Sequence, residues 1–323
     1  MKPRILVVGS LVMDLIVTTE RFCGAGETVI GKDFTTAPGG KGANQAVQAA
    51  RLGADVTMVG KVGKDDFGKA LIRSLRESGV NTDCILSVNG VSTAVGNVQI
   101  QKNAQGVENR IIVVPGANFA LTKEDVAFLE EKIADYDMVI LQHEIPMEVN
   151  VAVAAFAHAK NVPVVLNPAP SAAVPEEMIP WVTFLCPNEH EAGDISGIQP
   201  VNADSILGSA NRLHEMGFRK VLITWGKNGC MLSDGATTTF SPAMENVAVV
   251  DPTAAGDSFI GAFCTAIAAG IPEKDALVFA NCTAGITVSR MGAQTSLPTF
   301  DEVIAVLNRT DCTGGIFRRI KEV

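Results

Sequence analysis

Short apolar runs and longer helical stretches alternate along most of the chain. Residues 137–141, 162–166 and 220–224 are rich in branched apolar side chains, which is typical of buried strands. Residues 147–160 and 203–217, which lie between them, predict helices. Strands that alternate with helices indicate an α/β protein whose mostly parallel sheet carries helices on both faces.

Two regions depart from this rhythm. Residues 12–36 contain strand-like pieces without a helix, and residues 92–114 alternate between apolar and polar positions. The pair Gln105-Gly106 lies where a hairpin turn would join the halves of the second region. We expect these segments to form a small antiparallel sheet that acts as a lid over a site at the strand ends. The alternative is that they are edge strands of the main sheet.

The sequence shows no repeat, linker or charge block, so we expect one domain over residues 1–323, with the lid formed by about 12–36 and 92–114. Hydrophobic residues make up 47% of the chain, which excludes a disordered protein. The formal net charge of -9 argues against a nucleic-acid binder, which usually has a basic face.

We expect neither a membrane protein nor a secreted one. No apolar run reaches the roughly 18 residues of a transmembrane helix. The basic start of the chain resembles a signal peptide, but Asp14 interrupts the apolar run, so a buried first strand fits better. The seven cysteines are scattered and form no C-x-x-C pair, which favours reduced, mostly buried thiols in a cytoplasmic protein.

The first candidate for chemistry is the glycine-rich segment 37–46. Gly39, Gly40 and Gly42 leave the backbone N–H groups open to close approach, and the helix-forming stretch 43–52 follows at once. Such a turn at a helix N-terminus favours hydroxyl and anionic ligands. A tight turn without a ligand is the alternative.

The second candidate is the segment 251–259, in which small residues lead into an apolar helix over 259–269. Backbone N–H groups of residues 254–257 would point out of the helix start and form an anion hole. Asp257 lies in that first turn. Its carboxylate is either an N-terminal cap or a general base beside a bound phosphate.

Two further polar segments follow apolar runs. Asn188-Glu189-His190-Glu191 follows 182–187, and carboxylates near phosphates usually act through Mg²⁺, although a capped surface helix would look the same. The segment 224–230 follows another strand. Its two glycines suit a loop that passes close to a nucleotide, and a plain hairpin turn is the alternative.

Three other patterns are weak. Residues 63–70 match G-x-x-x-x-G-K, but Ala70 replaces the hydroxyl residue of a P-loop and two aspartates would repel phosphate. Gly256-Asp257-Ser258 resembles part of a serine-hydrolase motif without a recognisable histidine partner. No two His or Cys residues have the spacing of zinc ligands.

Read together, segments 39–44 and 251–259 resemble the two signatures of the PfkB/ribokinase family of sugar kinases, in the right order. Asn188-x-x-Glu191 resembles the family's N-x-x-E motif, and residues 166–170 and 292–294 are also similar. The resemblance extends from Leu6 to about Leu307. It implies a Rossmann-like sheet with a β-lid that often pairs with a second subunit, which predicts a homodimer.

The resemblance implies an ATP-dependent sugar kinase that transfers the γ-phosphoryl group to a sugar hydroxymethyl group, with the 5-hydroxyl of D-ribose as the leading acceptor. It also implies Mg²⁺ and an activating monovalent cation such as K⁺. A kinase for 2-deoxyribose or another sugar, and a catalytically silent sugar-binding protein, are the alternatives.

The resemblance also assigns roles by position. Asp257 is implied to be the base, and the N–H groups of Ala254, Ala255 and Gly256 the anion hole. The implied sugar-binding residues are Asp14, Gly40, Lys41, Asn44, Glu144 and Asp257. The implied nucleotide-binding residues are Asn188, Thr224, Gly226, Gly229, Gly256 and Asn281. Glu191 is implied to organise Mg²⁺ through water. The implied monovalent-cation loop contains Asp251, Thr253, Val288, Met291, Ala293 and Ser296, and acts mainly through backbone oxygens.

The chain departs from the family pattern at two positions. Pro252 replaces the usual threonine, which leaves the anion hole intact but removes an N–H group beside the cation loop. Val12 stands where a polar residue often faces the sugar. Since valine cannot form hydrogen bonds, an apolar position here would suit 2-deoxyribose.

Overall fold

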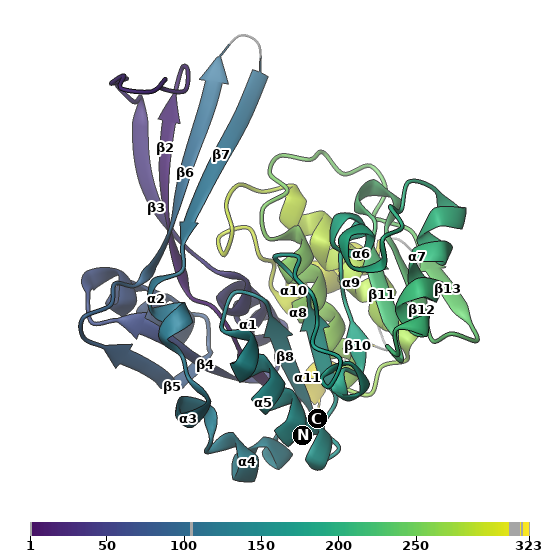
Figure 1. The fold of residues 1–323 in the computed structure, drawn as a ribbon. Helices are drawn as coiled ribbons and strands as arrows, with labels where there is room; N and C mark the ends of the chain where they lie inside the picture. Colours follow the sequence, from purple (N-terminus) through teal and green to yellow (C-terminus); the bar gives the residue numbers. More distant parts are fainter. Residues whose placement is uncertain (1, 104–105, 310–316, 318, 323) are drawn as a thin grey trace.

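The computed structural model describes residues 2–103, 106–309, 317 and 319–322 (Figure 1). The strands of its central sheet are β1 (Arg4–Val8), β4 (Asp55–Gly63), β5 (Asn81–Val88), β8 (Met138–Gln142), β9 (Val164–Asn167), β10 (Phe184–Leu185), β11 (Val221–Thr224), β12 (Cys230–Ser233) and β13 (Thr238–Ser241). Within the described residues they are ordered β13-β12-β11-β10-β9-β8-β1-β4-β5. The pairs from β5 to β11 are parallel and those of β12 and β13 are antiparallel, which confirms the mostly parallel sheet.

Both faces of this sheet are covered, because its strands are apolar on both sides. Within β1, Ile5 and Val7 join one hydrophobic core, whereas Leu6 and Val8 join the other. The first core includes residues of α1 (Lys41–Arg51), α2 (Asp66–Glu77), α8 (Ala255–Ala268), α9 (Glu273–Val288), α10 (Phe300–Leu307) and α11 (Arg319–Glu322). The second includes residues of α3 (Lys123–Val126), α4 (Leu129–Lys132), α5 (Met147–Ala159), α6 (Glu189–Ser196) and α7 (Ala203–Glu215).

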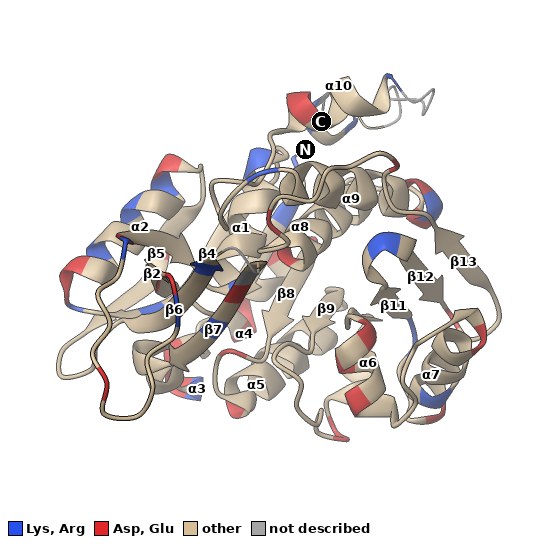
Figure 2. Ribbon diagram, turned by 90° about the horizontal axis from the view of Figure 1, so that it is seen from above, with Lys and Arg blue, Asp and Glu red and all other residues tan. Residues whose placement is uncertain are grey.

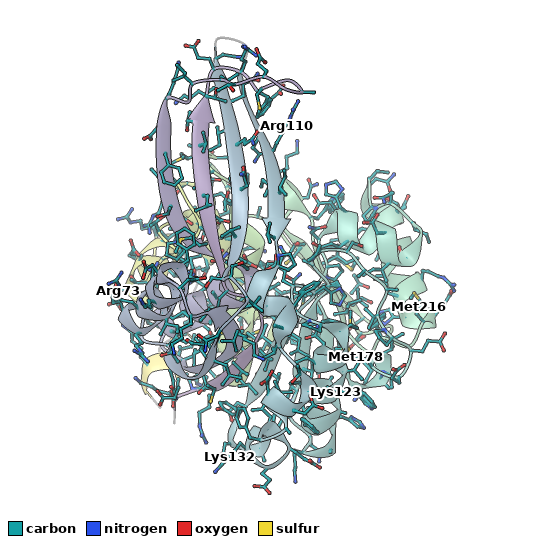
Figure 3. All side chains as sticks on the ribbon, turned by 60° about the vertical axis from the view of Figure 1, so that its left-hand side comes forward. Arg73, Arg110, Lys123, Lys132, Met178 and Met216 are labelled. Carbon is teal, nitrogen blue, oxygen red and sulfur yellow. The ribbon has the colours of Figure 1, made fainter. Side chains whose placement is uncertain are left out.

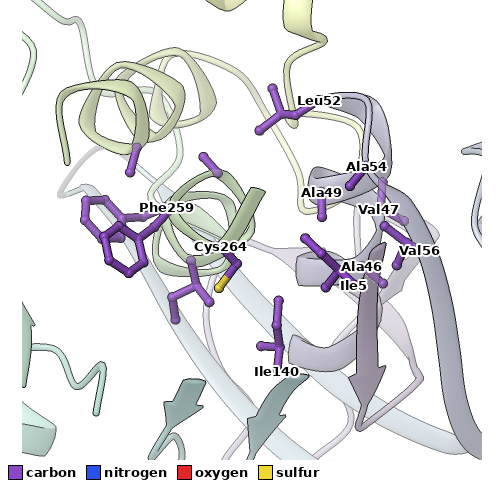
Figure 4. Close-up of a cluster of buried hydrophobic side chains, with 14 of the residues drawn as sticks. Ile5, Ala46, Val47, Ala49, Leu52, Ala54, Val56, Ile140, Phe259 and Cys264 are labelled. Atoms are coloured by element: carbon purple, nitrogen blue, oxygen red, sulfur yellow. The ribbon is translucent and has the colours of Figure 1, made fainter. Parts of the chain in front are cut away.

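Helices α1 and α8, which carry residues of the two glycine-containing segments singled out in the sequence, pack together in the first core. Figure 4 shows that Ala46 and Ala49 of α1 belong to the same buried cluster as Cys264 of α8 and Ile140 of β8. Small residues let the two helices approach closely. Short 3-10 helices complete the connections: η1 (Gly116–Ala120), η2 (Ile133–Asp135), η3 (Ile179–Trp181) and η4 (Gly226–Asn228).

A second sheet projects from the main body (Figure 1). It consists, in the part of the chain described, of β2 (Val12–Thr19), β3 (Asp33–Gly39), β6 (Ala94–Asn103) and β7 (Gly106–Val114), ordered β3-β2-β6-β7. This confirms the separate small sheet, and the interpretation as edge strands of the main sheet is wrong. Gly106 opens β7 as the hairpin prediction requires, while Gln105 lies outside the described residues.

The expectation of an antiparallel lid sheet is wrong at its centre. The pairs β2–β3 and β6–β7 are antiparallel, but β2 and β6 run parallel, with Asp14 opposite Gly96. The physical reason is the connection between them, which passes through α1, β4, α2 and β5 of the main body. Since β2 and β6 both leave that body in the same direction, they meet side by side.

Helices α5 and α7 confirm the predictions over 147–160 and 203–217. Helix α8 begins at Ala255, four residues before the expected start, because Ala254 adopts a left-handed conformation (φ 60°) and turns the chain directly into the helix. The first turn of α8 therefore contains Gly256 and Asp257.

Charge and cysteine placement fit the composition. Helices α2 and α7 each carry both basic and acidic residues (Figure 2). None of the described helices is both long and apolar enough to span a membrane. The six described cysteines have free thiols, and four of them are buried, while Cys312 lies outside the described residues.

Candidate active site

The N-terminus of α8 lies at the edge of a cavity of about 200 Å³. Its lining residues come from α1, α6, α8 and the ends of β9, β10 and β11: Lys41, Asn167, Ala169, Cys186, Asn188, Glu191, Thr224, Pro252, Ala254, Ala255, Gly256, Asp257 and Ile260. The cavity thus lies at the carboxyl ends of parallel strands, where open α/β sheets bind ligands. The two segments singled out in the sequence, 39–44 and 251–259, meet here.

The first turn of α8 offers backbone donors to this cavity. N–H groups in a first helical turn have no intrahelical acceptor. The Ala255 N–H donates to the Pro252 carbonyl at 3.2 Å, which closes the turn before the helix. Apart from its chain neighbours and the backbone of its own helix, no atom of the described residues would lie within 4 Å of a Cβ atom on Gly256, so the space above this residue is open. This geometry suits an anion that binds beside Gly256 and Asp257.

Two amides of α1 hold the Asp257 carboxylate. The Asn44 Nδ2 donates to Oδ2 at 2.9 Å, and the Gln45 Nε2 donates to Oδ1 at 3.0 Å. Among the described hydrogen bonds, the Asp257 carboxylate accepts from these two amides and not from an N–H group of its own helix. Of the two interpretations of Asp257, the structure therefore favours a carboxylate aimed at the cavity over a structural cap.

Glycines allow the start of α1 to lie against β1 and β2. Gly40 has φ 92°, and a Cβ atom there would lie 2.8 Å from the Val12 nitrogen. A Cβ atom on Gly42 would lie 2.6 Å from the Ser10 nitrogen. Only glycine fits such a close backbone approach, so the glycine-rich segment sets the position of Lys41.

The Lys41 side chain lies in a strongly acidic environment. Burial lowers the pKa of this ammonium group, but nearby carboxylates outweigh burial and raise the pKa above its ordinary value. These carboxylates belong to Asp257, Glu144 and Glu191. Lys41 thus stays charged and places a positive group beside the cavity.

Asp14 and Glu144 form an acidic pair near the junction of lid and main body. Burial and the neighbouring Glu144 raise the pKa of Asp14 to about 6. Glu144 accepts hydrogen bonds from the Ser10 hydroxyl at 2.5 Å and the Lys41 N–H at 3.0 Å. The predicted sugar-binding residues Gly40, Lys41, Asn44 and Glu144 therefore lie around the start of α1, linked to Asp257 through Asn44.

Val12 lies on the same face of β2 as Asp14. A Cβ atom on Gly96 would lie 2.3 Å from Asp14 Oδ1 and 3.8 Å from Val12 Cγ1, so both side chains project toward Gly96. Val12 is 6% exposed. The apolar residue that departs from the family pattern is therefore a direct neighbour of Asp14.

Most of the predicted nucleotide-binding residues lie at or next to the cavity, but Asn281 does not. Asn188 and Thr224 line the cavity and face each other in a parallel β-bridge, with Gly226 and Gly229 in the loop that follows. Asn281 lies elsewhere: its Nδ2 donates to both oxygens of Ser241, at 3.2 and 3.0 Å, and it is absent from the cavity lining.

Glu191 fits an indirect role toward a divalent cation. Asn188 caps α6, and Glu191 Oε2 accepts the Asn188 N–H at 2.9 Å, so the predicted cap is present. Glu191 nevertheless lines the cavity, and its burial raises its pKa. Across the described residues no group of three His, Cys, Asp or Glu could cage a metal. Mg²⁺ usually keeps several waters and binds through few carboxylates plus phosphates, which this arrangement fits.

The predicted cation loop is joined by Asp251. Its Oδ1 accepts the Thr253 N–H and its Oδ2 the Gly292 N–H, both at 2.9 Å. The two segments 251–253 and 288–296 thus lie together, with oxygen donors that suit a hard cation. Three predicted ligands are already engaged: the carbonyl oxygens of Val288 and Ala293 each accept two hydrogen bonds, and that of Met291 accepts one from the Thr295 hydroxyl at 3.0 Å.

The weak patterns have structural explanations. The Asp65 carboxylate accepts the Gly68 N–H at 2.8 Å and caps α2, so the P-loop-like segment holds its own anion. The Ser258 hydroxyl is fully buried and donates to the Ala255 carbonyl at 2.9 Å, so the hydrolase hypothesis is wrong.

Comparison with known proteins identifies the family. The model of the pfkB family of carbohydrate kinases matches residues 2–300. The chain belongs to the pfkB family of carbohydrate kinases. Its relatives include a ribokinase of Bacillus subtilis, 41% identical over 304 residues (94% of this chain, 99% of the relative), and a ribokinase of Lactococcus lactis, 38% identical over 310 residues (95% and 98%).

A solved structure of Arabidopsis thaliana ribokinase, complexed with ribose and ATP, has the same architecture. Its TM-score to this pfkB protein is 0.88 at 32% identity, and the match covers 95% of this chain and 99% of that one. The Rossmann-like sheet and its small second sheet are thus confirmed by relatives of the same family.

Sequence reasoning missed several polar residues that the pfkB fold places beside the site. Gln45 is fully buried next to Asp257, and Asn167 lines the cavity. Ser10 donates to Glu144. One signal was available for Gln45: it is a polar residue among the alanines of a helix that packs inside the protein.

Proposed function

We propose that this protein transfers the γ-phosphoryl group of ATP to the 5-hydroxyl of D-ribose. One observation carries the proposal: the Asp257 carboxylate, held by two amides of α1, faces the same cavity as the open N-terminus of α8. The close relatives are ribokinases, and a similar structure was solved with ribose and ATP, which supports this substrate pair.

The residues account for each part of the transfer. Asp257 takes the proton of the 5-hydroxyl as the new O–P bond forms and the bond between the γ-phosphorus and ADP breaks. The N–H groups of Ala254 and Gly256 at the start of α8, with Lys41, stabilise the negative charge that spreads over the phosphoryl oxygens. The predicted donor Ala255 N–H is instead engaged by the Pro252 carbonyl. Such transfer depends on positioning and charge stabilisation, which is what this site supplies.

The sugar lies, in this proposal, between the lid and the start of α1. Asp14, Glu144, Lys41, Asn44 and the Gly40 backbone supply its polar partners. Asn44 is only 5% exposed, and its buried Oδ1 has no hydrogen-bond partner among the described residues. A sugar hydroxyl would satisfy this acceptor, which otherwise costs free energy.

Two cations complete the proposal. Glu191 would hold Mg²⁺ through water, and the ion would neutralise phosphate charge. Asp251, Thr253, Met291 and Ser296 would hold a monovalent cation such as K⁺ beside the start of α8, although the Met291 carbonyl also accepts from the Thr295 hydroxyl. The carbonyls of Val288 and Ala293 would join only by giving up a hydrogen bond. Asn188, Thr224, Gly226 and Gly229 bind the nucleotide, with Asn281 supporting the adjacent strands.

A kinase for 2-deoxyribose is the second candidate, and one observation favours it. Val12 lies beside Asp14 and offers no hydrogen bond. A site that binds a hydroxyl through a polar group rejects the deoxy sugar strongly, whereas an apolar contact discriminates weakly. We therefore expect 2-deoxyribose to be phosphorylated, with a smaller loss of kcat/KM than a polar residue 12 would cause.

The experiment is ADP release from Mg-ATP in K⁺ and in Na⁺ buffers, with D-ribose, 2-deoxy-D-ribose, fructose or a nucleoside. The proposal expects the highest kcat/KM with ribose and a higher rate in K⁺. A higher kcat/KM with 2-deoxyribose would instead establish the second candidate. Absence of ADP release with every sugar would contradict both and favour a sugar-binding protein without activity.

We also propose one domain with a lid that pairs with the lid of a second copy. Strand β7 is an edge strand whose residues 111–114, Ile-Ile-Val-Val, are 47–64% exposed. Figure 3 shows side chains projecting from both faces of this sheet, with Arg110 near its far end. An exposed apolar edge invites strand pairing. A cytoplasmic location fits an enzyme that uses ATP.

A further inference from the structure

The amide of Gln45 links the proposed base to the interior of the protein. Gln45 lies on α1 and is completely buried. Its Nε2 donates to Asp257 Oδ1 at 3.0 Å and to Asn167 Oδ1 at 3.2 Å. Its Oε1 accepts from Gln142 Nε2 at 2.8 Å. Both hydrogens of the amide nitrogen are therefore used, and the oxygen is used as well.

The neighbours of Gln45 fix which end of its amide faces Asp257. Asn167 donates its Nδ2 to the Cys186 carbonyl at 3.0 Å, so its Oδ1 must face Gln45. Gln142 presents its Nε2 to the oxygen of Gln45, and its own backbone carbonyl accepts from Asn150 Nδ2 at 2.8 Å. If the Gln45 amide were flipped, its nitrogen would face the Gln142 nitrogen, and its oxygen would face the oxygens of Asp257 and Asn167, which can only accept hydrogen bonds.

This arrangement restrains the carboxylate as well as the amide. Asn44 holds Oδ2 and Gln45 holds Oδ1, so rotation of the Asp257 carboxylate would break a hydrogen bond to each of two adjacent residues of one helix. Because both hydrogens and the oxygen of the Gln45 amide are used, this amide cannot turn without losing hydrogen bonds. Displacement of a reacting group by about 1 Å costs on the order of 10²-fold in rate.

We propose that Gln45 is a positioning residue for phosphoryl transfer, which holds Asp257 Oδ1 through an amide oriented by Gln142 and Asn167. The inference rests on the proposed function, because it assigns Gln45 a role that acts only through the proposed base. It touches neither sugar nor phosphate. Loss of its hydrogen bond lowers kcat and leaves substrate binding nearly unchanged.

A double-mutant cycle tests this role in the full chain. Gln45→Met keeps the length of the side chain but cannot donate to Asp257. We expect it to lower kcat about 10- to 100-fold, the scale of a displaced reacting group. The KM values for ribose and ATP should stay within threefold. In the Asp257→Asn background the same change should lower kcat less than threefold further, because the group it positions is already gone.

Gln48→Met is the matched control. Gln48 is also a fully buried glutamine of α1, but its Nε2 donates to the Pro298 carbonyl at 3.0 Å, and none of the described hydrogen bonds joins it to Asp257. At saturating K⁺ this variant should keep kcat within threefold of wild type. If Gln45→Met does not fold, Gln142→Leu replaces it. That variant removes only the partner that orients Gln45 and should lower kcat several-fold with unchanged KM values.

The outcomes separate the two proposals. An unchanged kcat in Gln45→Met would overturn the positioning role. So would an equal loss of kcat from this change in the wild-type and Asp257→Asn backgrounds. In either case an inactive Asp257→Asn would still support the base. A fully active Asp257→Asn would overturn the base itself, and the positioning role with it.

Discussion

At the scale of single residues, the surroundings of each carboxylate determine what it can do. Glu191 is engaged by the backbone of its own helix cap, and Asp257 by two side-chain amides. Asp14 instead lies between Gly39 and Gly96, and a Cβ atom on either glycine would approach its oxygens within 2.6 Å. Asp14 is half-buried beside Glu144, and both its burial and this neighbouring carboxylate raise its pKa to about 6.

We expect Asp14→Asn to make the fold more stable and to weaken the binding of ribose. Because the folded-state pKa of Asp14 lies above its unfolded value, folding is favoured when this carboxyl is protonated and is opposed as pH rises through about 6. The variant should raise Tm at pH 7.5 by about 2–4 °C in the absence of sugar, and by less at pH 4.5. Its KM for ribose should rise about tenfold or more, since a charged acceptor is lost. Calorimetry at both pH values checks the sign, and a lower Tm at pH 7.5 would contradict it.

At the scale of elements, helix α1 organises the site from one end to the other. Its first turn carries Lys41, its buried face carries Asn44 and Gln45, and Arg51 in its last turn donates to the carbonyls of Gln294 and Leu297 at 2.6 and 2.8 Å. One rigid helix thus connects the proposed sugar site, the base and the loop proposed to hold a cation.

The pairing of β2 with β6 yields a prediction at this scale. In Gly96→Ala the new methyl group would lie 2.3 Å from Asp14 Oδ1, so the carboxylate must move. We expect the KM for ribose to rise about 3- to 30-fold, equivalent to roughly 0.7–2 kcal/mol, with kcat and the KM for ATP within threefold. Gly24→Ala is the control, because its nearest atom is Glu27 Oε2 at 3.6 Å. An unchanged ribose KM in Gly96→Ala would refute the placement of the sugar beside Asp14.

Sequence reasoning performed best where local pattern decides the structure. Helices α5 and α7 follow from periodicity, and the polar residues after strands do meet at one cavity. The parallel pairing of β2 and β6 could not be predicted, because it depends on a crossover of more than 70 residues between them. Nor could the contact of Gln45 with Asp257, since the packing of α1 against α8 joins residues that lie 212 positions apart.

At the scale of the whole molecule, the lid exposes apolar side chains that its own sheet leaves uncovered. Residues 111–114 expose four consecutive apolar side chains, and Phe34 on the opposite edge strand is 60% exposed. Apolar area in water is unfavourable by about 25 cal/mol per Å², so a partner that covers these edges would stabilise the lid.

Ile112→Lys should therefore separate the proposed dimer. Ile112 is 64% exposed at the centre of this apolar edge, where a lysine would oppose strand pairing. Light scattering at micromolar concentration should give twice the 33.9 kDa chain mass for wild type and the single mass for the variant. Val201 lies outside the lid and is 76% exposed, so the control variant Val201→Lys should remain dimeric. A monomeric wild type would rule out lid pairing.

The central claim is that Asp257 removes the proton from a pentose hydroxyl during transfer from ATP. The most direct measurement compares the initial rate of ADP release at saturating D-ribose, Mg-ATP and K⁺ in wild type and Asp257→Asn. The account predicts a kcat about 10²-fold or more below wild type, with an unchanged KM for ATP and a normal unfolding transition. A kcat within fivefold of wild type would contradict it.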